Sequence, residues 1–304
     1  MNRHRIRLIC GWLAVMLSTA IACFWAFWGI IENFHEGWYG QSVLQNLGIM
    51  FVQYLSPMIV FVMLGLIGVR WHLVGGALHS ALALAAVCFF GRRVFSGALL
   101  IASPLFLLGA LYFIGLVSLR KRAAQILLGL PLLVLILCGI EPAIRVSQRV
   151  DDGDRGSRIV EGNGVRLGWA PQGPGWPDRG MPWAQAKRRC RYLTEDGTAV
   201  ADTPQDIWRL PTVEEAVRSM ARHGRNCGGE WDEGHARAIY TISPDKESPL
   251  WNTHSLVIYW WTATEIDDEN AYMIVYDGKV WPRNKRYAGD YFAFRAVRDV
   301  KAAR

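Results

Sequence analysis

The chain has 304 residues, a length that suits about two domains, and it carries a formal net charge of +7. The basic excess falls within positions 1–150, in short breaks between long apolar segments. This distribution argues against nucleic acid as a partner, because a nucleic-acid-binding protein gathers its lysines and arginines into one basic patch. We predict a membrane domain over residues 1–150, a polar linker over 151–157 and a second domain over 158–304.

Five apolar segments fill the first half of the chain, at about 8–31, 43–69, 73–90, 94–119 and 123–141. The first contains no charged residue and gives roughly 36 Å of helix at 1.5 Å per residue. The hydrocarbon core of a bilayer is about 30 Å thick, so such a segment can cross it. We predict five transmembrane helices, with the lipid bilayer as the partner of this domain.

The basic residues predict the orientation of these helices. With the N-terminus inside, most fall on the cytoplasmic side, as the positive-inside rule expects: Arg3, Arg5, Arg7, Arg70 and Arg120-Lys121-Arg122. Glu32 and Glu36 then lie outside, and the pair Arg92-Arg93 is the exception. Five spans place everything after Glu141 outside the cytoplasm. We therefore predict a multi-pass protein of the bacterial cytoplasmic (inner) membrane with an extracytoplasmic, periplasmic C-terminal domain.

His79 is the ionisable residue that lies well within a predicted span. Pumps and channels usually carry ionisable groups inside the bilayer. A lone intramembrane histidine more often donates a hydrogen bond between helices. We therefore predict that the first domain anchors or assembles the protein, with transport as the alternative.

The second half of the chain combines strands and helices. Alternation and turn residues predict a strand pair over 158–170, amphipathic helices at about 183–194 and 213–222, an irregular stretch at 224–257, and strands at 258–263, 271–276, 279–283 and 291–298. Strands, two helices and then antiparallel strands in this order predict an α+β domain.

A strand, a corner and a helix start lie between the two predicted helices. Trp208 and Leu210 alternate with Arg209, which turns both apolar side chains to one side of a short extended segment. Thr212 followed by Glu215 is a capping box, which indicates the start of a helix. We interpret Trp208, Arg209, Thr212 and Glu215 as structural residues of the domain.

Four motifs of this half resemble the Lcl C-terminal domain family, a bacterial extracellular module. They are Trp183-Ala184-x-Ala186 with Cys190 and Leu193, then Trp208-Arg209-Leu210-Pro211-Thr212, Tyr259-Trp260-Trp261-Thr262-Ala263 and Phe294-Arg295-Ala296-Val297-Arg298. The resemblance covers about residues 160–300 and none of the membrane half. It implies a fold of the C-type-lectin-like or formylglycine-generating-enzyme-like type, and a binding or recognition module.

The sequence departs from those relatives at their functional motifs. The calcium and sugar motifs of C-type lectins are absent from the sequence. Formylglycine-generating enzymes activate oxygen at a late pair of cysteines, whereas no cysteine follows Cys227 here. We therefore predict no cofactor and no catalytic residue, and keep an enzyme of formylglycine-generating-like fold as the alternative function.

Two cysteines, Cys190 and Cys227, lie outside the membrane half. Members of the resembled family often carry cysteine in place of Ala296, able to pair with the cysteine of the first helix. Disulfides persist in an oxidising compartment, and the helix before Cys227 should pack near the helix that carries Cys190. We hypothesise a Cys190–Cys227 disulfide, against the alternative of a buried free thiol at Cys190 and an exposed one at Cys227.

Several side chains of this domain are candidates for ligand contact. Aromatic rings stack on sugars, but in a small domain they more often belong to the core. The candidates are Trp231, Trp251, Asn252, Trp281 and Tyr287.

Two groups of residues are candidates for a metal site. Glu265, Asp267, Asp268 and Glu269 offer the oxygen ligands that calcium prefers, although an exposed acidic turn is the commoner explanation. His223, Cys227 and His235 do not match a zinc spacing. We predict no metal.

The sequence thus predicts a membrane-anchored protein that displays a lectin-like recognition module outside the cytoplasm, with a glycan or a protein as its ligand. A structural membrane assembly protein is the remaining alternative.

Overall fold

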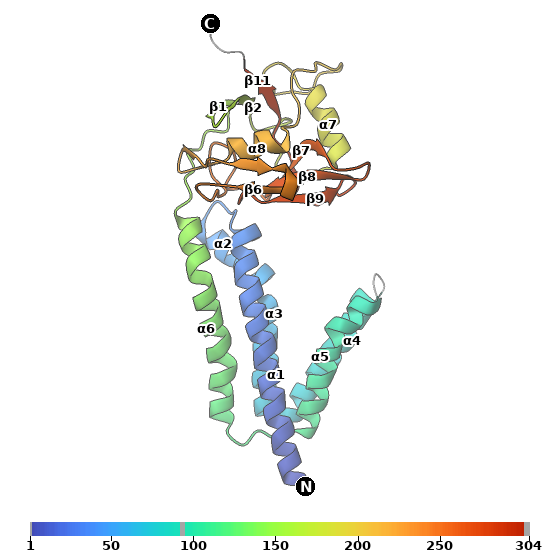
Figure 1. Ribbon diagram of the computed structural model, residues 1–304. Coiled ribbons are helices and arrows are strands. Elements are labelled where there is room, and N and C mark those ends of the chain that lie inside the picture. Colours follow the sequence, from blue (N-terminus) through green and yellow to red (C-terminus); the bar gives the residue numbers. More distant parts are fainter. Residues whose placement is uncertain (1, 92–94, 301–304) are drawn as a thin grey trace. The chain divides into compact units, whose positions relative to one another are not determined.

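The computed structural model describes residues 2–91 and 95–300, and it divides into two compact units (Figure 1), Met1–Val146 and Ser147–Arg304. The first unit is helical. The second is rich in β-strands and carries two short helices, which makes it an α+β unit.

In the described residues, the helical elements are, in chain order, α1 (Arg3–Glu32), π-helical η1 (Asn33–Gly37), α2 (Val43–Ile49), π-helical η2 (Met50–Tyr54), α3 (Ser56–Arg70), α4 (His72–Phe90), α5 (Phe95–Ile114) and α6 (Arg120–Ser147). Within the described residues, three helices are long and apolar enough to cross a membrane: Arg3–Glu36, His72–Phe90 and Arg120–Ser147. The bent pair Val43–Tyr54 and Ser56–Arg70, with 60° between its parts, makes a fourth if it is one span.

These helices are consistent with membrane association. The prediction of five spans and the predicted orientation stay predictions, because α5 contributes a shorter described apolar helix, Leu99–Ile114. The predicted exception to the positive-inside rule, Arg92-Arg93, and the start of the predicted fourth span lie outside the described residues.

Close backbone contacts hold the helical unit together. A Cβ atom on Gly75 of α4 would lie 2.3 Å from the Cα of Gly68 in α3, so these two helices meet where neither residue has a side chain. The His79 imidazole bonds through Nδ1 to the carbonyl oxygen of Gly75 at 2.7 Å, within its own helix. Its contact with another helix is instead a ring stack on Tyr112 of α5, with 5.1 Å between the centroids.

The second unit contains helices α7 (Trp183–Arg191) and α8 (Val213–Ser219) and a 3-10 turn, η3 (Glu233–His235). Its strands are β1 (Arg158–Gly162), β2 (Val165–Trp169), β3 (Ala221–Arg222), β4 (Arg225–Asn226), β5 (Glu230–Asp232), β6 (Arg237–Ile239), β7 (Tyr259–Glu265), β8 (Asn270–Val275), β9 (Val280–Asn284), β10 (Phe292–Ala293) and β11 (Val297–Asp299). They form a three-stranded sheet, β1-β2-β11, a central sheet, β10-β7-β8-β9, and two small ribbons, β3-β4 and β5-β6.

The central sheet separates two hydrophobic clusters. Successive side chains of a strand point to opposite faces, so Trp260 and Trp261 of β7 serve different clusters. Trp260 lies with the buried residues of α8 and with Cys227, whereas Trp261 lies with the buried residues of α7, among them Cys190. The tryptophan pair therefore fixes one helix on each side of the sheet.

The corner before α8 forms as the sequence predicts. Thr212 caps the helix by accepting from the Glu215 amide at 3.1 Å, and the Glu215 carboxylate accepts from the Thr212 amide at 2.8 Å, which completes the capping box. Arg209 donates two further bonds of 2.7 Å to Glu215, and this pairing raises the pKa of Arg209. Trp208 is 2% exposed. The corner thus combines an ion pair, a helix cap and a buried aromatic anchor.

Four predicted elements differ in their bounds. The first helix ends at Arg191 because Leu193 already pairs with Val200 in an extended bridge. The second helix, predicted at about 213–222, ends at Ser219, and Ala221–Arg222 form β3. The stretch at 224–257, predicted to be irregular, contains β4 and the β5-β6 ribbon. The predicted last strand is two strands, since β10 pairs with β7 while β11 pairs with β2. The chain therefore changes sheets between residues 293 and 297.

The polar segment predicted as a linker is held in place within the second unit. Asp151 accepts two bonds from Arg155, at 2.7 and 2.8 Å, and one from the Thr253 hydroxyl. Just before it, Arg149 pairs with the buried Asp245 at 3.0 Å. The pKa of Asp151 lies well below its usual range, because the bond from Arg155 outweighs the opposing effect of burial. Segment 149–155 is thus fixed to the loop at 245–253.

Candidate functional site

Trp251, predicted to contact a ligand, serves the fold instead, whereas ligand contact by Asn252 stays a prediction. Trp251 is 1% exposed and stacks on Trp260 with 3.7 Å between the ring centroids. The ring belongs to the hydrophobic core and exposes no surface that a sugar could contact. The prediction of Trp251 as a ligand contact is therefore wrong. Asn252 uses its side-chain oxygen to accept from the His254 amide at 2.9 Å, which shapes the local turn.

The other three candidates do not form one surface. Trp231 packs edge-on against Tyr272, with 5.3 Å between centroids. Trp281 is 51% exposed and is the register partner of Met273, whose side chain points to the sheet face opposite that of Tyr272. Tyr287 is 43% exposed and lies under the Arg283 guanidinium, 4.7 Å from it. Among the candidate ligand contacts in the described chain, Trp281 and Tyr287 are the exposed aromatic residues.

The predicted Cys190–Cys227 disulfide is wrong. Both residues are free thiols, and both are buried, on opposite faces of the central sheet. The alternative of an exposed Cys227 is also wrong, since its side chain belongs to the cluster of α8. Burial raises the pKa of both thiols, that of Cys227 to about 11. Neither is a thiolate at neutral pH, so neither is a nucleophile.

Two carboxylates of the acidic turn after β7, those of Glu265 and Asp267, already have partners within the protein. Glu265 pairs with Lys285 at 2.7 Å, and Asp267 accepts from the amides of Glu269 and Asn270 at 2.8 and 2.7 Å. Within residues 2–91 and 95–300, no group of three or more His, Cys, Asp or Glu side chains is placed to hold a metal ion.

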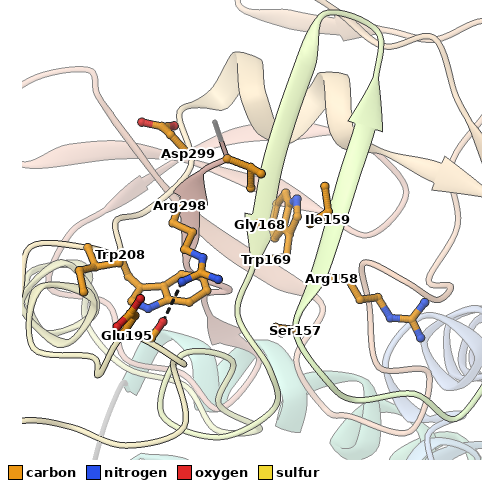
Figure 2. A pocket seen from close by; sticks show the side chains of 11 residues that line it. Ser157, Arg158, Ile159, Gly168, Trp169, Glu195, Trp208, Arg298 and Asp299 are labelled. Carbon is orange, nitrogen blue, oxygen red and sulfur yellow. Dashed lines mark hydrogen bonds between the residues drawn. The ribbon is translucent and has the colours of Figure 1, made fainter. Parts of the chain in front are cut away.

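A cleft of about 660 Å³ opens on the three-stranded sheet (Figure 2). The register places Ile159 of β1, Gly168 of β2 and Arg298 of β11 side by side on one face. Gly168 lacks the side chain that would fill the space between its neighbours, since a Cβ atom there would lie 3.2 Å from the Arg298 Cγ. The missing side chain in the middle strand therefore forms the floor of the cleft.

Arg298 forms one wall of the cleft together with Trp208. Its guanidinium lies 4.9 Å from the centroid of the Trp208 ring, and Nη1 donates to the carbonyl oxygen of Glu195 at 2.9 Å. Figure 2 shows this arginine between the Trp208 ring and strand β2. A second hollow of about 670 Å³ shares Arg298 and Glu195 and extends over the turn at 194–199. Arg298 and Glu195 therefore border both hollows.

Among the described residues, the lining side chains Arg158 and Asp299 form ion pairs, whereas Glu195 and Arg298 form none. Arg158 pairs with Asp152 and Asp154, at 2.7 and 3.1 Å. Asp299 is taken by Arg209 at 2.7 Å. In the part of the chain that the structure describes, Arg298 bonds to a backbone carbonyl and pairs with no carboxylate. Its guanidinium therefore keeps N–H donors for an anionic group of a ligand.

In the sequence, Arg298 is recognisable only as the last residue of a core motif. Strand alternation could have indicated that the Arg298 side chain points outward, because the side chain before it, that of Val297, is buried. The second feature that could have indicated the cleft is Gly168, a glycine between Leu167 and Trp169 in β2. Neither residue indicates a cleft alone, since the register between β2 and β11 is needed to bring them together.

A family model described as a domain of unknown function (DUF7670) matches residues 1–125. The match covers most of the helical unit and none of the cleft. Comparisons with curated proteins and with solved structures give no match.

Proposed function

We propose that this protein is a membrane-anchored recognition protein. The helical unit holds it in the cytoplasmic membrane, and the second unit, displayed outside the cytoplasm, binds its ligand in the cleft beside Arg298. The observation that carries this proposal is the Arg298 guanidinium, stacked on Trp208 and without a carboxylate partner among the described residues, in the wall of a cleft of about 660 Å³.

The chemistry of the cleft favours a ligand with an acidic group. An arginine presents a planar fork of N–H donors that matches a carboxylate, and stacking on an aromatic ring holds that fork in place. Ile159 and Ile207 line the same cleft with exposed apolar surface. A carboxylate-bearing glycan or peptide offers both the anion and the apolar body that these side chains would contact.

The resemblance to the Lcl C-terminal domain family supports a lectin-like recognition module. The motif at 208–212 builds the corner that carries Trp208, and the motif at 259–263 builds the central strand β7. The motif at 294–298 ends in Arg298 itself. Residues of these motifs therefore contribute to the walls of the cleft as well as to the core.

A binding experiment on the full-length protein in detergent tests the proposal. We expect the wild type to bind the carboxylated members of an array that also contains neutral glycans and peptides. Arg298→Gln should weaken that binding by about 10- to 100-fold, as expected for the loss of a charged hydrogen-bond donor pair. Arg283→Gln is the matched control, because Arg283 also lies over aromatic rings but outside the cleft. Equal losses in the two variants, or binding confined to neutral array members, would contradict the proposal.

A further inference from the structure

Four helices of the helical unit meet at one polar layer. The Ser18 hydroxyl of α1 lies 3.2 Å from the Tyr112 hydroxyl of α5, and Tyr112 reaches the carbonyl oxygen of Gly65 in α3 at 3.4 Å. The ring of His79 in α4 stacks on the same tyrosine. The four residues Ser18, Gly65, His79 and Tyr112 therefore tie α1, α3, α4 and α5 together at one level, which we call the polar layer.

One or two helical turns beyond the polar layer, the same four helices line an apolar cavity of about 890 Å³. Ile21 follows Ser18 in α1, Phe61 precedes Gly65 in α3, Leu82 follows His79 in α4, and Leu105 precedes Tyr112 in α5. Figure 1 shows the α4–α5 hairpin leaning away from α1 toward its far end. The helices are thus joined at the polar layer and spread apart at the cavity.

The lining of the cavity determines which molecule can occupy it. Apart from Ser56, its side chains are apolar or aromatic, and Phe24, Phe89 and Leu100 expose much of their surface. Water does not fill such a space, because it finds no polar partners there. An empty cavity would forfeit the contacts that its walls make in a packed interior. In a bilayer, the abundant apolar chain is the acyl chain of a lipid.

We propose that this cavity binds one acyl chain of a membrane lipid. The chain enters between the α4–α5 hairpin and α1, and its end rests above the polar layer near Ile21, Phe61 and Leu82. The site is lined by four helices rather than by one lipid-facing surface, so it holds its chain longer than the bilayer around it does. This inference gives the helical unit a ligand of its own, independent of any ligand of the Arg298 cleft.

Photolabelling of the full-length protein in proteoliposomes tests the site. The probe is a phosphatidylethanolamine with a diazirine in its acyl chain, and mass spectrometry maps the labelled peptides. We expect labelling to concentrate on residues 21–25, 56–61, 82–90 and 100–105. Ala86→Phe fills the cavity from α4 and should lower that labelling by about tenfold. Ala81→Phe is the control, since Ala81 is exposed on the same helix and does not line the cavity.

Two results would overturn the inference. One is labelling spread evenly over lipid-facing peptides such as 132–137 of α6. The other is concentrated labelling that Ala86→Phe leaves unchanged. If Ala86→Phe loses its helical circular dichroism, Ala85→Phe replaces it, because Ala85 lines the same wall. Retention of one lipid per chain in native mass spectra, reduced by the filling variant and not by Ala81→Phe, is the second supporting readout.

Discussion

Arg295 and Arg298 lie in one short segment, and each places its guanidinium over a tryptophan ring, yet their surroundings differ. Arg295 is fully buried, 3.7 Å from the Trp176 ring, and donates to the carbonyl oxygens of Ala170 and Leu250 at 2.8 and 3.2 Å. Further bonds reach Pro249 and Gly156. Arg298 is half-buried and donates to one carbonyl oxygen. Arg295 uses its N–H donors in bonds that stabilise the fold, whereas Arg298 keeps N–H donors for a ligand.

The largest expected effect is that of Arg295→Ala. It would leave several buried carbonyl oxygens without a donor, at about 1–3 kcal/mol each, so we expect the free energy of unfolding to fall by about 3–5 kcal/mol. Urea unfolding of the full-length protein, followed by tryptophan fluorescence, measures this. A loss no larger than that of Arg298→Ala would break the comparison between the two arginines.

Trp208 and Trp281 allow the same comparison between a buried residue and an exposed one. Trp208→Ala removes a buried ring and should cost about 3–5 kcal/mol, the range for large aromatic side chains in cores. Trp281→Ala removes an exposed ring and should change the free energy of unfolding by about 0.5 kcal/mol or less. The same urea titrations compare them. Equal costs would mean that Trp208 does not anchor the wall of the cleft.

Lys246 extends the comparison to a buried lysine. It is 2% exposed, its ammonium donates to the carbonyl oxygen of Ser255, and burial, aided by the nearby charge of Arg149, lowers its pKa from 10.5 to about 7. Between these two values the unfolded chain binds more protons at this lysine than the folded protein does. Stability should therefore rise with pH from about 7 toward 10.5, by at most about 1.4 kcal/mol per pH unit. Lys246→Met should flatten this rise in unfolding titrations at pH 7, 8 and 9, and parallel curves for the two proteins would contradict the assignment.

The cap of α8 is expected to have a smaller effect. Thr212→Ala removes the acceptor for the Glu215 amide and should cost about 1 kcal/mol. Thr212→Ser keeps that acceptor and is the control. A cost for Ser as large as that for Ala would show that the methyl group of Thr212, rather than its hydroxyl, stabilises the corner.

The smallest effect on stability is expected for Arg298→Gln. Its guanidinium makes one bond to the backbone, so the free energy of unfolding should change by about 0.5 kcal/mol or less while ligand binding falls. Thermal unfolding with and without a bound array ligand separates the two quantities. Stability lost together with binding would assign Arg298 to the fold, like Arg295.

Local patterns were sufficient for part of this fold. The capping box at Thr212 and Glu215 and the neighbouring strands predicted at 271–276 and 279–283 each depend on residues close in sequence. The capping box forms, and the two strands pair as β8 and β9 on either side of Asp277-Gly278. Contacts between residues far apart in the sequence could not be predicted from such local patterns. The cysteines were expected to meet because their helices were expected to pack together, but the alternating Trp260 and Trp261 place a sheet between them.

Predicting the candidate site required even more knowledge of contacts between residues far apart in the sequence. Trp208 was predicted as a buried anchor from its own neighbours, and its burial is confirmed. Arg298 became a candidate only when the register of β2 and β11 placed it beside Gly168. A single sequence gives the outward direction of such a side chain, but not the residue that lies next to it in the sheet.

The sheet change between β10 and β11 has a consequence for the order of events during synthesis. β2 acquires its neighbour β11 only after almost the whole second unit has left the ribosome, and Arg295 reaches a carbonyl oxygen at Ala170, 125 residues earlier. Contacts this distant form late and slowly, because the loop between them must close first. Until then the edge of β2 stays open to other chains. Rapid completion of β11 therefore shortens the time during which β2 of the nascent second unit can pair with another chain.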